Sequence, residues 1–525
     1  MRFLLIVFVT LFLLAGCSDD NSTNPENQTY ESFEEIKIPN GFEFSTTNNI
    51  QLNILSGLRA PVAVTGNDGI EYNKFTTDET GYTTGNITIP STVTSLNFTY
   101  LDNTYTYDIN PTSLTLDIEL FNATGEIDED AKYVGNYIVP ILDGIVHNDD
   151  GSITAHWGYV SYYANNKNIS IGYKNNFTGV GITDEDQGQP TTFSPGFHHE
   201  VFTVDFTPTG DERITWLVKT RRTVTAYADA NSRVMPGPDE DGDEIPDDED
   251  DYPSDPNKAY DNYYPSEGAF GTLMYEDLWP NLGDHDFNDL VIEYNMHEIE
   301  DSWNDVVEVN GTLKLIAIGA SKQNGFFIEL PFWYEDVTLV ESYIEGTSLQ
   351  MELFTYDDEL AILKVFNNTN DLIQLDGTYM NTIEAEPVFD AIEMTFKLTI
   401  DYGYKSSKVV GGLIYSAPYN PYLTIDHDAT REIHLPGLPP TSNADVSIFG
   451  TGDDATNVDD YYFYQTASGI PWALDITSEI KYPQEYTDVV IAFPQFGNWV
   501  NSNGGSFTDW YDNPQIDKVY DLQNK

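Results

Sequence analysis

The sequence contains one cysteine in 525 residues, Cys17, and few basic side chains. A single cysteine cannot form a disulfide within the chain, so packed cores or bound metal must stabilise the folded parts. Only 23 Lys and Arg residues stand against 86 Asp and Glu residues, which gives a formal net charge of −63. Because this charge repels phosphate groups, the composition argues against nucleic acid or anionic lipid head groups as partners and favours divalent cations.

The chain also lacks a long apolar segment. The apolar run at residues 3–14 is shorter than the ~20 residues that cross a bilayer, but it follows Arg2 as the apolar part of a secretory signal does. The run ends in Leu14-Ala15-Gly16-Cys17, which resembles the lipobox of bacterial lipoproteins. The resemblance implies that residues 1–16 are removed and that the thiol of Cys17 is lipidated. The alternatives are an ordinary signal cleaved near Ala15 and an unprocessed N-terminal anchor.

The residues after Cys17 predict a flexible tether over 17–33, and they begin with Ser18-Asp19-Asp20. This start resembles the short acidic tag that sends some Gram-negative lipoproteins to the outer face of the outer membrane. The expected location is therefore the cell surface, with a membrane attachment through the N-terminal lipid. The periplasmic face of the membrane is the alternative.

Helical periodicity is scarce, whereas short runs of alternating apolar and polar residues are frequent. Such runs are typical of half-buried strands, and aromatic residues at 14% argue against disorder. We expect a mostly β protein with antiparallel sandwiches in tandem over 34–125 and 126–235, an acidic loop over 236–260 and a larger strand-rich domain over 261–525. The predicted strands include 51–55, 86–89, 96–100, 114–118, 153–157, 169–173, 200–206, 214–218, 311–318 and 394–400.

The acidic loop has the spacing of a calcium-binding loop. Residues 239–255 include 11 Asp or Glu and no basic residue, so they either stay solvated or fold around cations. Ligand positions 1, 3, 5, 9 and 12 of an EF-hand-type loop carry carboxylates, and position 7 supplies a backbone carbonyl. The predicted calcium ligands are Asp239, Asp241, Asp243, Ile245, Asp247 and Asp250. The alternative is a solvated acidic linker.

The run 239–250 is similar to a thrombospondin type 3 calcium-binding repeat. It departs from that pattern at position 6, where Glu244 replaces the usual glycine. If this position requires a positive φ, a non-glycine residue costs ~1 kcal/mol or more. We expect an affinity of ~10⁻⁴–10⁻³ M, as in extracellular modules, and a structural role for calcium in rigidifying the junction between the second and third domains.

The C-terminal part carries a further resemblance. The motifs TLMYEDLWP at 272–280 and GDHDFNDLV at 283–291 resemble the start of the LruC domain, and later matches extend the likeness over about 236–515. The later matches include 464–466, 470–476, 482–483, 496–499 and 509–511. The resemblance implies a cell-surface or secreted lipoprotein and brings no biochemical activity with it.

A second oxygen-rich site is possible within these motifs. Asp284, Asp286 and Asn288 repeat the opening of a calcium loop, with Glu276, Asp277 and Asp289 close in sequence. Positions 9 and 12 of that register are not carboxylates, so a complete EF-hand loop is absent. The alternative is that these carboxylates cap turns while Phe287, Leu290 and Val291 enter the core.

No nucleophile elbow, zinc-protease motif or phosphate-binding loop occurs in the sequence. We expect a non-catalytic surface lipoprotein that acts in adhesion or in binding an external protein or glycan. A carbohydrate-active enzyme and a purely structural envelope protein are the alternatives. An aromatic platform for sugars is weighed against sandwich core for Tyr461, Tyr462, Tyr464, Trp472, Trp499 and Trp510. The sequence identifies neither the ligand nor the oligomeric state.

Overall fold

The fold is taken from a computed structural model of the chain. It describes residues 28–522 except 43, 57–58, 79–80, 101–102, 111–114, 121–136, 149, 211, 222, 233–234, 236, 358, 374–378, 385–387, 406–407 and 411–412. The signal segment, the lipobox with Cys17 and the acidic tag therefore lie outside the described residues.

The first unit is a small sandwich of two sheets. One sheet has the order β4-β1-β7 and the other the order β3-β2-β5-β6. All pairings are antiparallel except the parallel pair of β1 and β7. The strands are β1 (Thr47–Ser56), β2 (Pro61–Gly66), β3 (Glu71–Thr76), β4 (Tyr82–Pro90), β5 (Ser95–Tyr100), β6 (Asn103–Asp108) and β7 (Thr115–Leu120).

The second unit packs the sheet β13-β9-β8 against the sheet β11-β14-β15, with β10 and β12 paired beside them. Trp157 and Trp216 lie fully buried between the two main sheets. The strands are β8 (Ile138–His147), β9 (Ile153–Ser161), β10 (Lys167–Asn168), β11 (Asn175–Gly179), β12 (Thr192–Phe193), β13 (Gly196–Phe206), β14 (Ile214–Lys219) and β15 (Thr223–Ala228).

The C-terminal body is built on a larger pair of sheets. A seven-stranded sheet has the order β21-β24-β19-β18-β17-β29, with β16 also paired to β18, and a five-stranded sheet has the order β22-β23-β20-β27-β28. The seven-stranded sheet contains β16 (Tyr260–Tyr264), β17 (Gly271–Tyr275), β18 (Leu290–Glu300), β19 (Asp305–Ala317), β21 (Val337–Ile344), β24 (Ile392–Lys405) and β29 (Ala473–Ile476). The five-stranded sheet contains β20 (Gly325–Trp333), β22 (Glu352–Phe354), β23 (Leu360–Phe366), β27 (Asn420–Ile425) and β28 (Asp428–His434).

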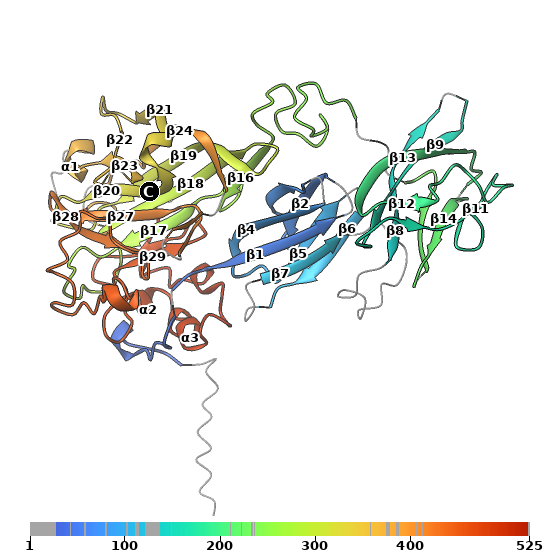
Figure 1. Cartoon of the computed structure of the whole chain (residues 1–525). Helices are drawn as coiled ribbons and strands as arrows, with labels where there is room; N and C mark the ends of the chain where they lie inside the picture. The colour runs from blue at the N-terminus through green and yellow to red at the C-terminus, as the bar shows by residue number, and fades with distance from the viewer. Residues whose placement is uncertain are drawn as a thin grey trace, which may run out of the picture.

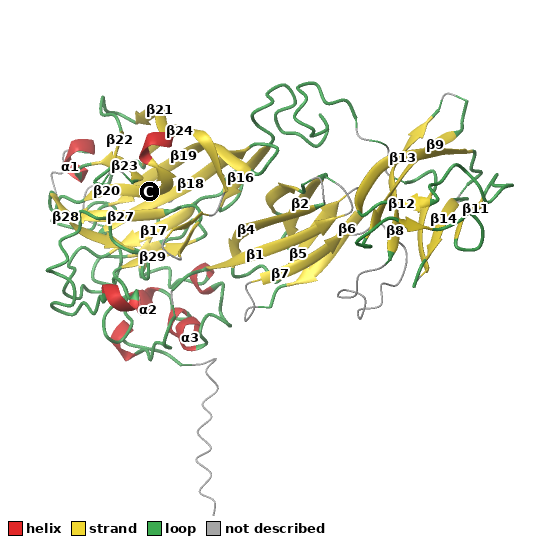
Figure 2. Cartoon of the chain, viewed as in Figure 1, coloured by secondary structure: helices red, strands yellow, loops and turns green. Residues whose placement is uncertain are grey.

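Short elements complete the body, and Figure 2 shows how small the helical part is beside the strands. The remaining strands are β25 (Lys408–Val410), β26 (Leu413–Tyr415), β30 (Tyr482–Pro483) and β31 (Val519–Tyr520). The helices are α1 (Thr369–Leu372), α2 (Val489–Ala492) and α3 (Phe496–Asn501), with 3-10 turns at Phe33–Glu35, Tyr334–Asp336, Val458–Asp460 and Trp510–Asp512.

Two cores lie on the two faces of the larger sheet. One fills the space between the sheets and includes Tyr275 and Leu423. The other lies under α2 and α3 and includes Phe33 and Phe44, which come from the segment before β1. This N-terminal segment therefore packs in the C-terminal body, hundreds of residues away in sequence, and leads from there into the first sandwich.

The three units stand in a row in Figure 1, with the first sandwich between the C-terminal body and the second sandwich. Val139 and Ile141 of β8 join the core of the first sandwich, so the two sandwiches pack against each other. The acidic segment after β15 runs over the end of the first sandwich to β16 (Figure 1).

The mostly β fold with tandem sandwiches predicted from the sequence is confirmed. One predicted strand, 169–173, is wrong, because these residues form a turn around Gly172, whose φ is +124°. Asn175 holds that turn by donating from its side-chain amide to the carbonyl oxygens of Ile169 and Pro190.

Candidate calcium sites

The acidic segment folds around its own backbone amides. Asp239 accepts hydrogen bonds from the amides of Gly242 at 2.7 Å and Glu244 at 3.0 Å, and Asp243 accepts one from Ile245 at 2.8 Å. Asx-type bonds of this kind close tight turns. The spacing noted in the sequence therefore produces a compact loop rather than an extended linker.

Three of the predicted ligands converge. Asp239, Asp241 and Asp243 each offer a carboxylate oxygen, and these oxygens lie within 4.8 Å of one another. Asp250 lies near enough for Asp243 and Asp241 to raise its pKa. Asp247 instead bends back, and its Oδ1 accepts a hydrogen bond from the amide of Glu240 at 2.7 Å. The carboxylates at ligand positions 1, 3 and 5 therefore lie together, whereas the carboxylate at position 9 binds the backbone at the start of the loop.

Two carboxylates of this loop are buried with an oxygen left over. Asp243 is 9% exposed and Asp250 is 8% exposed, and the Oδ2 of each accepts no hydrogen bond from any described residue. Burial raises the pKa of both groups, to about 6 for Asp250, although the amide of Tyr252 works against the shift. Buried anionic oxygens without a partner are costly unless a cation binds them.

Glu244 stands at position 6 of the loop, where the calcium-binding pattern usually has glycine. Its φ is +75°, in the left-handed region that favours glycine. The loop therefore forms the turn despite the side chain. The Glu244 carboxylate pairs with Arg59 of the first sandwich at 2.9 Å.

Ile245, the predicted carbonyl ligand, anchors the loop through its side chain. It is fully buried and packs on Ala259 and Tyr260, which lead into β16. The phenol of Tyr260 in turn shares a 2.5 Å hydrogen bond with Thr76 of β3. The loop therefore sits on the contact between the first sandwich and the C-terminal body.

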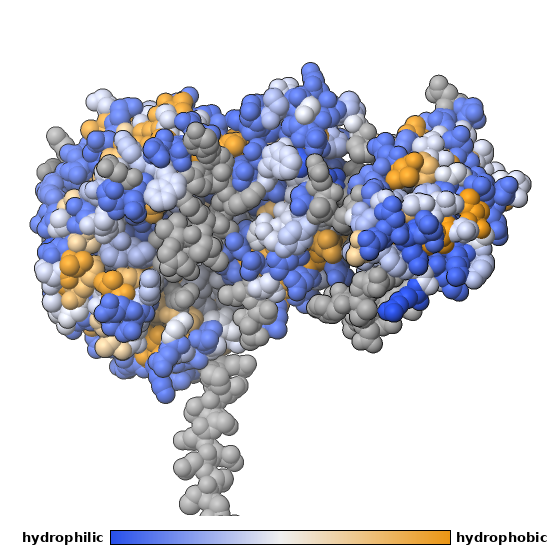
Figure 3. Space-filling model, viewed as in Figure 1, coloured by the Kyte–Doolittle hydropathy of each residue, from blue (hydrophilic) through white to orange (hydrophobic). Residues whose placement is uncertain are grey.

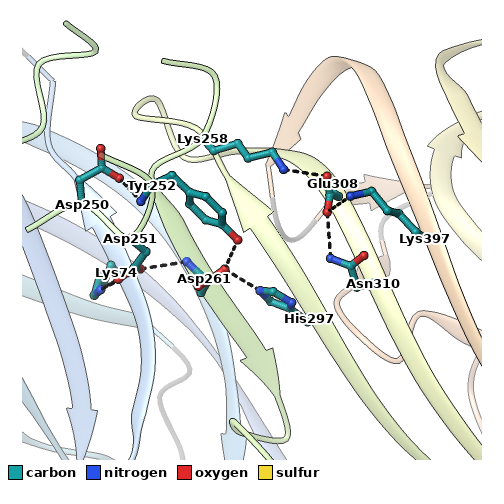
Figure 4. Close-up of polar contacts among 10 residues, drawn as sticks. All are labelled: Lys74, Asp250, Asp251, Tyr252, Lys258, Asp261, His297, Glu308, Asn310 and Lys397. Carbon is teal, nitrogen blue, oxygen red and sulfur yellow. Dashed lines mark hydrogen bonds and ion pairs between the residues drawn. The ribbon is translucent and has the colours of Figure 1, made fainter. Parts of the chain in front are cut away.

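Figure 4 shows the polar contacts at the end of the segment. Lys74 of β3 binds both oxygens of Asp251 at 2.8 and 2.9 Å, and Asp251 accepts the amide of Asp261 at 3.1 Å. Asp261 also binds Tyr252 and His297, so one carboxylate joins the segment, β16 and β18.

A second group of contacts in Figure 4 surrounds Glu308 of β19. Lys258 and Lys397 each donate to it at 2.8 Å, and Asn310 donates at 3.0 Å. Burial alone would raise the pKa of Glu308, but these donors outweigh it and lower the pKa to about 2. The junction is therefore a set of satisfied ion pairs beside a loop whose carboxylates are not all satisfied.

The second predicted cluster lies between β17 and β18. Glu276, Asp284 and Asp286 offer oxygens that lie within 4.8 Å of one another. Asp277 instead binds Lys322 and Asn324, and Asp289 accepts the amide of Asp277 at 2.7 Å. The apolar part of the alternative is also present, because the three residues it named are buried in the core: Phe287, Leu290 and Val291.

Sequence reasoning missed a further carboxylate at this cluster. Tyr486, the next residue, donates its amide to Asp286 at 2.8 Å, and burial together with the charges of Asp286 and Asp284 raises the pKa of Glu485 to about 8. About 200 residues separate Glu485 from Asp286 along the chain, and no local spacing connects them.

The aromatic platform considered for sugar binding is not formed. Tyr464, Trp472, Trp499 and Trp510 are at most 1% exposed and belong to the two cores of the C-terminal body. Tyr461 alone of the six is largely exposed, at 64%. The core assignment is therefore correct for these four side chains, whereas Tyr461 lies on the surface and Tyr462 is half-buried.

Comparisons with known proteins place only part of the chain. Residues 304–511 match the model of a family described as a domain of unknown function, DUF4842. This range begins beside β19 and leaves out both sandwiches, the acidic loop and the Glu276 cluster. A search of curated proteins gave no match.

Two solved structures are similar to the chain. A "Putative lipoprotein from Bacteroides ovatus" is 15% identical, with a TM-score of 0.39, over 74% of this chain and 100% of that one. The native conformation of Escherichia coli alpha-2-macroglobulin is 9% identical, with a TM-score of 0.09, over 76% of this chain and 22% of that one. At these TM-scores neither likeness supports an inference.

Among the described residues, no helix has the length and apolar character that crossing a membrane requires.

Proposed function

We propose that the chain is a non-catalytic lipoprotein, anchored through Cys17 at the cell surface, that binds an external protein or glycan and is stabilised by calcium. The lipobox-like end of residues 1–17 and the acidic tag support the anchor and its outward display. The LruC-like motifs over 236–515 agree with that location. The observation that carries the calcium part is the acidic loop, where Asp243 and Asp250 are buried and each has one oxygen without a hydrogen-bond partner among the described residues, at the contact between the first sandwich and the C-terminal body.

The proposed role of calcium is to hold the units together. Met235, just before the loop, donates its amide to the carbonyl of Ile145 in the second sandwich. Arg59 of the first sandwich pairs with Glu244, and Ile245 packs against the C-terminal body. An ion that neutralises the loop would favour this folded arrangement over the unfolded chain. The stabilised junction would then involve all three units, not only the second and third.

Thermal unfolding of the full chain in detergent, with calcium or with chelator, tests this role. If Kd is ~10⁻³ M, calcium at ten times that concentration stabilises the folded form by about 1.4 kcal/mol. The double variant D241N/D243N should lose the part of the calcium response that the loop supplies. The matched control is D459N/D460N, which alters two exposed aspartates of another turn and should keep it. An unchanged calcium response in D241N/D243N contradicts the proposed loop site.

The anchor is tested on intact cells. Protease added outside should remove the wild-type protein from the membrane fraction, whereas the variant C17A should be found unattached. Protection of the wild-type protein until the outer membrane is opened would assign it to the periplasmic face instead.

The release of cleaved product distinguishes an enzyme from a protein that only binds its ligand. Purified chain should bind glycans or extracellular protein on an array without releasing cleaved fragments in chromatography. Release of sugar fragments would overturn the non-catalytic assignment, and a chain with neither activity would favour a structural role in the envelope.

A further inference from the structure

The turn between β17 and β18 gathers carboxylates inside the C-terminal body. Glu276 directly follows β17, and Asp284 and Asp286 come from the loop that returns to β18. His285 and Phe287 have φ values of +64° and +55°, so both residues adopt the left-handed backbone conformation in this turn. Phe287 points into the core, while Asp284 and Asp286 bring their oxygens within 4.8 Å of Glu276.

Glu276 has a buried oxygen without a partner. Its side chain is 1% exposed, and Oε1 accepts the amide of Phe287 at 2.9 Å. Oε2 is buried and accepts no hydrogen bond from the described residues. Asp286, also 1% exposed, accepts the amides of Asn288 at 3.1 Å and Tyr486 at 2.8 Å, which fix its two oxygens.

Among the described residues, no Lys or Arg pairs with Glu276, Asp284 or Asp286, although His285 acts to lower the pKa of Asp284. Burial and the charges of Asp286 and Asp284 raise the pKa of Glu276 well above its usual range. Lys322 donates instead to the carbonyl and the carboxylate of the neighbouring Asp277. A buried cluster of this kind must either keep protons or bind a cation.

We propose that Glu276, Asp284 and Asp286 form a second divalent-cation site, with calcium as its ion. Oxygen-only ligands suit calcium, whose bonds of ~2.3–2.6 Å accommodate oxygens ~4–5 Å apart across the ion. Magnesium has shorter bonds of ~2.0–2.1 Å and demands regular octahedral geometry, which a buried carboxylate pair fixed by backbone amides meets less easily. Asp284 is solvent-exposed and provides the route by which the ion enters.

The site holds the C-terminal segment to the sheet. Asp286 accepts the amide of Tyr486, and Asn288 donates to the carbonyl of Pro483 at 3.1 Å. His285 accepts the amide of Val489 at the start of α2. Asp488, which caps α2, also accepts the amide of Phe33 at 2.8 Å. The bound ion would thus fix both α2 and the N-terminal segment that leads to the tether.

Calorimetric titration of the chelator-stripped full chain with calcium, and separately with magnesium, tests the site. Wild type should bind two calcium ions, and D241N/D243N should retain one. E276Q should bind the ion of the Glu276 cluster at least tenfold more weakly than wild type. The control E267Q alters an exposed glutamate of the preceding turn and should bind both ions as wild type does. Loss of both ions in D241N/D243N would indicate that the acidic loop alone binds calcium.

A second measurement separates a cation site from a protonated carboxyl group. Glutamine has nearly the shape of a neutral glutamic acid, so E276Q should fold, and without calcium it should unfold at or above the wild-type temperature. Calcium should slow hydrogen exchange at the amides of Tyr486 and Val489 in wild type but not in E276Q. Equal calcium protection in E276Q and wild type overturns the proposal, as does binding of magnesium in preference to calcium. D284N, altered at the exposed end of the cluster, should weaken binding as E276Q does.

Discussion

At the residue scale, Gly283 shows how closely the buried cluster is fitted. A Cβ at this position would lie 1.7 Å from Oε2 of Glu276. G283A should therefore displace the carboxylate and destabilise the chain by about 1–3 kcal/mol, as overpacking does. G505A is the control, because a Cβ there meets only Ser502 O at 3.4 Å. Thermal unfolding measures both, and an unchanged G283A would show that Glu276 moves freely.

We expect the stability of the fold to depend on pH through Glu329, which belongs to neither candidate calcium site. Its side chain is 8% exposed, and burial raises its pKa to about 7. The charge of Glu432 also raises this pKa, whereas the hydrogen bond from Asn420 lowers it. A raised pKa means that the folded state binds the proton more tightly than the unfolded state. The stabilisation is therefore complete below pH ~4.5 and is lost as the pH rises through 7.

The variant E329Q keeps the neutral shape and should remove this contribution. Between pH 5 and 8 the unfolding free energy of wild type should fall by roughly 2–3 kcal/mol more than that of E329Q, because the folded-state pKa of about 7 lies within this interval and the ordinary value of 4.5 lies below it. E335Q, on the exposed turn after β20, should follow wild type. Denaturant unfolding at several pH values checks the difference, and parallel curves for E329Q and wild type would refute it.

The residues of the two sites differ in how visible they are in the sequence. Asp239, Asp241 and Asp243 are close together because their spacing places them in one turn, and Glu244 at position 6 has the positive φ that the spacing requires. The segment with Glu485 reaches the second cluster, where Tyr486 donates to Asp286, only because the chain returns there after the strands of the C-terminal sheets. Such a contact depends on tertiary packing, which a local pattern does not contain.

At the scale of elements, alternation predicted the strands of the two sandwiches because the sheets there bury one face, as in β1, β5 and β14. It failed at 169–173, where Gly172 and the side chain of Asn175 favour a turn. It also did not predict that Phe33 and Phe44 pack beside Phe496, at 5.1 and 6.2 Å between ring centroids. A few apolar residues without a period carry no indication of which core they enter.

Arg59 is the element-scale test of the junction. It lies over the Trp303 ring at 4.1 Å, pairs with Glu244 and donates to the carbonyl of Ser302. R59A should loosen the first sandwich from the turn between β18 and β19, which adjoins the start of β16, and cost about 1–2 kcal/mol, since stacking and hydrogen bonding are both lost.

The control is R213A, which removes a similar stacking on Tyr227, at 4.7 Å, within the second sandwich. Hydrogen exchange should rise at the amides of β16 in R59A and stay unchanged there in R213A. Equal exchange at β16 in R59A and wild type would show that the junction does not depend on this contact.

At the scale of the whole molecule, the surface is strongly acidic. Figure 3 shows a mostly hydrophilic face over all three units, with smaller apolar patches. A net charge of −63 repels the units from one another, and the ion pairs of Lys74 and Arg59 act against that repulsion at one junction. The relative arrangement of the units should therefore respond to cations.

Small-angle X-ray scattering of the full chain in detergent-free nanodiscs or after contrast matching of the detergent measures this response. Millimolar calcium should reduce the maximum dimension relative to chelator, because it neutralises the loop that contacts the first sandwich and the C-terminal body and follows Met235 on the second sandwich. The same ionic strength supplied as sodium chloride should reduce it less, since screening acts on all surface charges weakly rather than on one buried group. D241N/D243N should lose the calcium-specific part and keep the salt-dependent part. If calcium and matched sodium chloride compact wild type equally, the acidic loop acts only as a screened surface and not as a clamp.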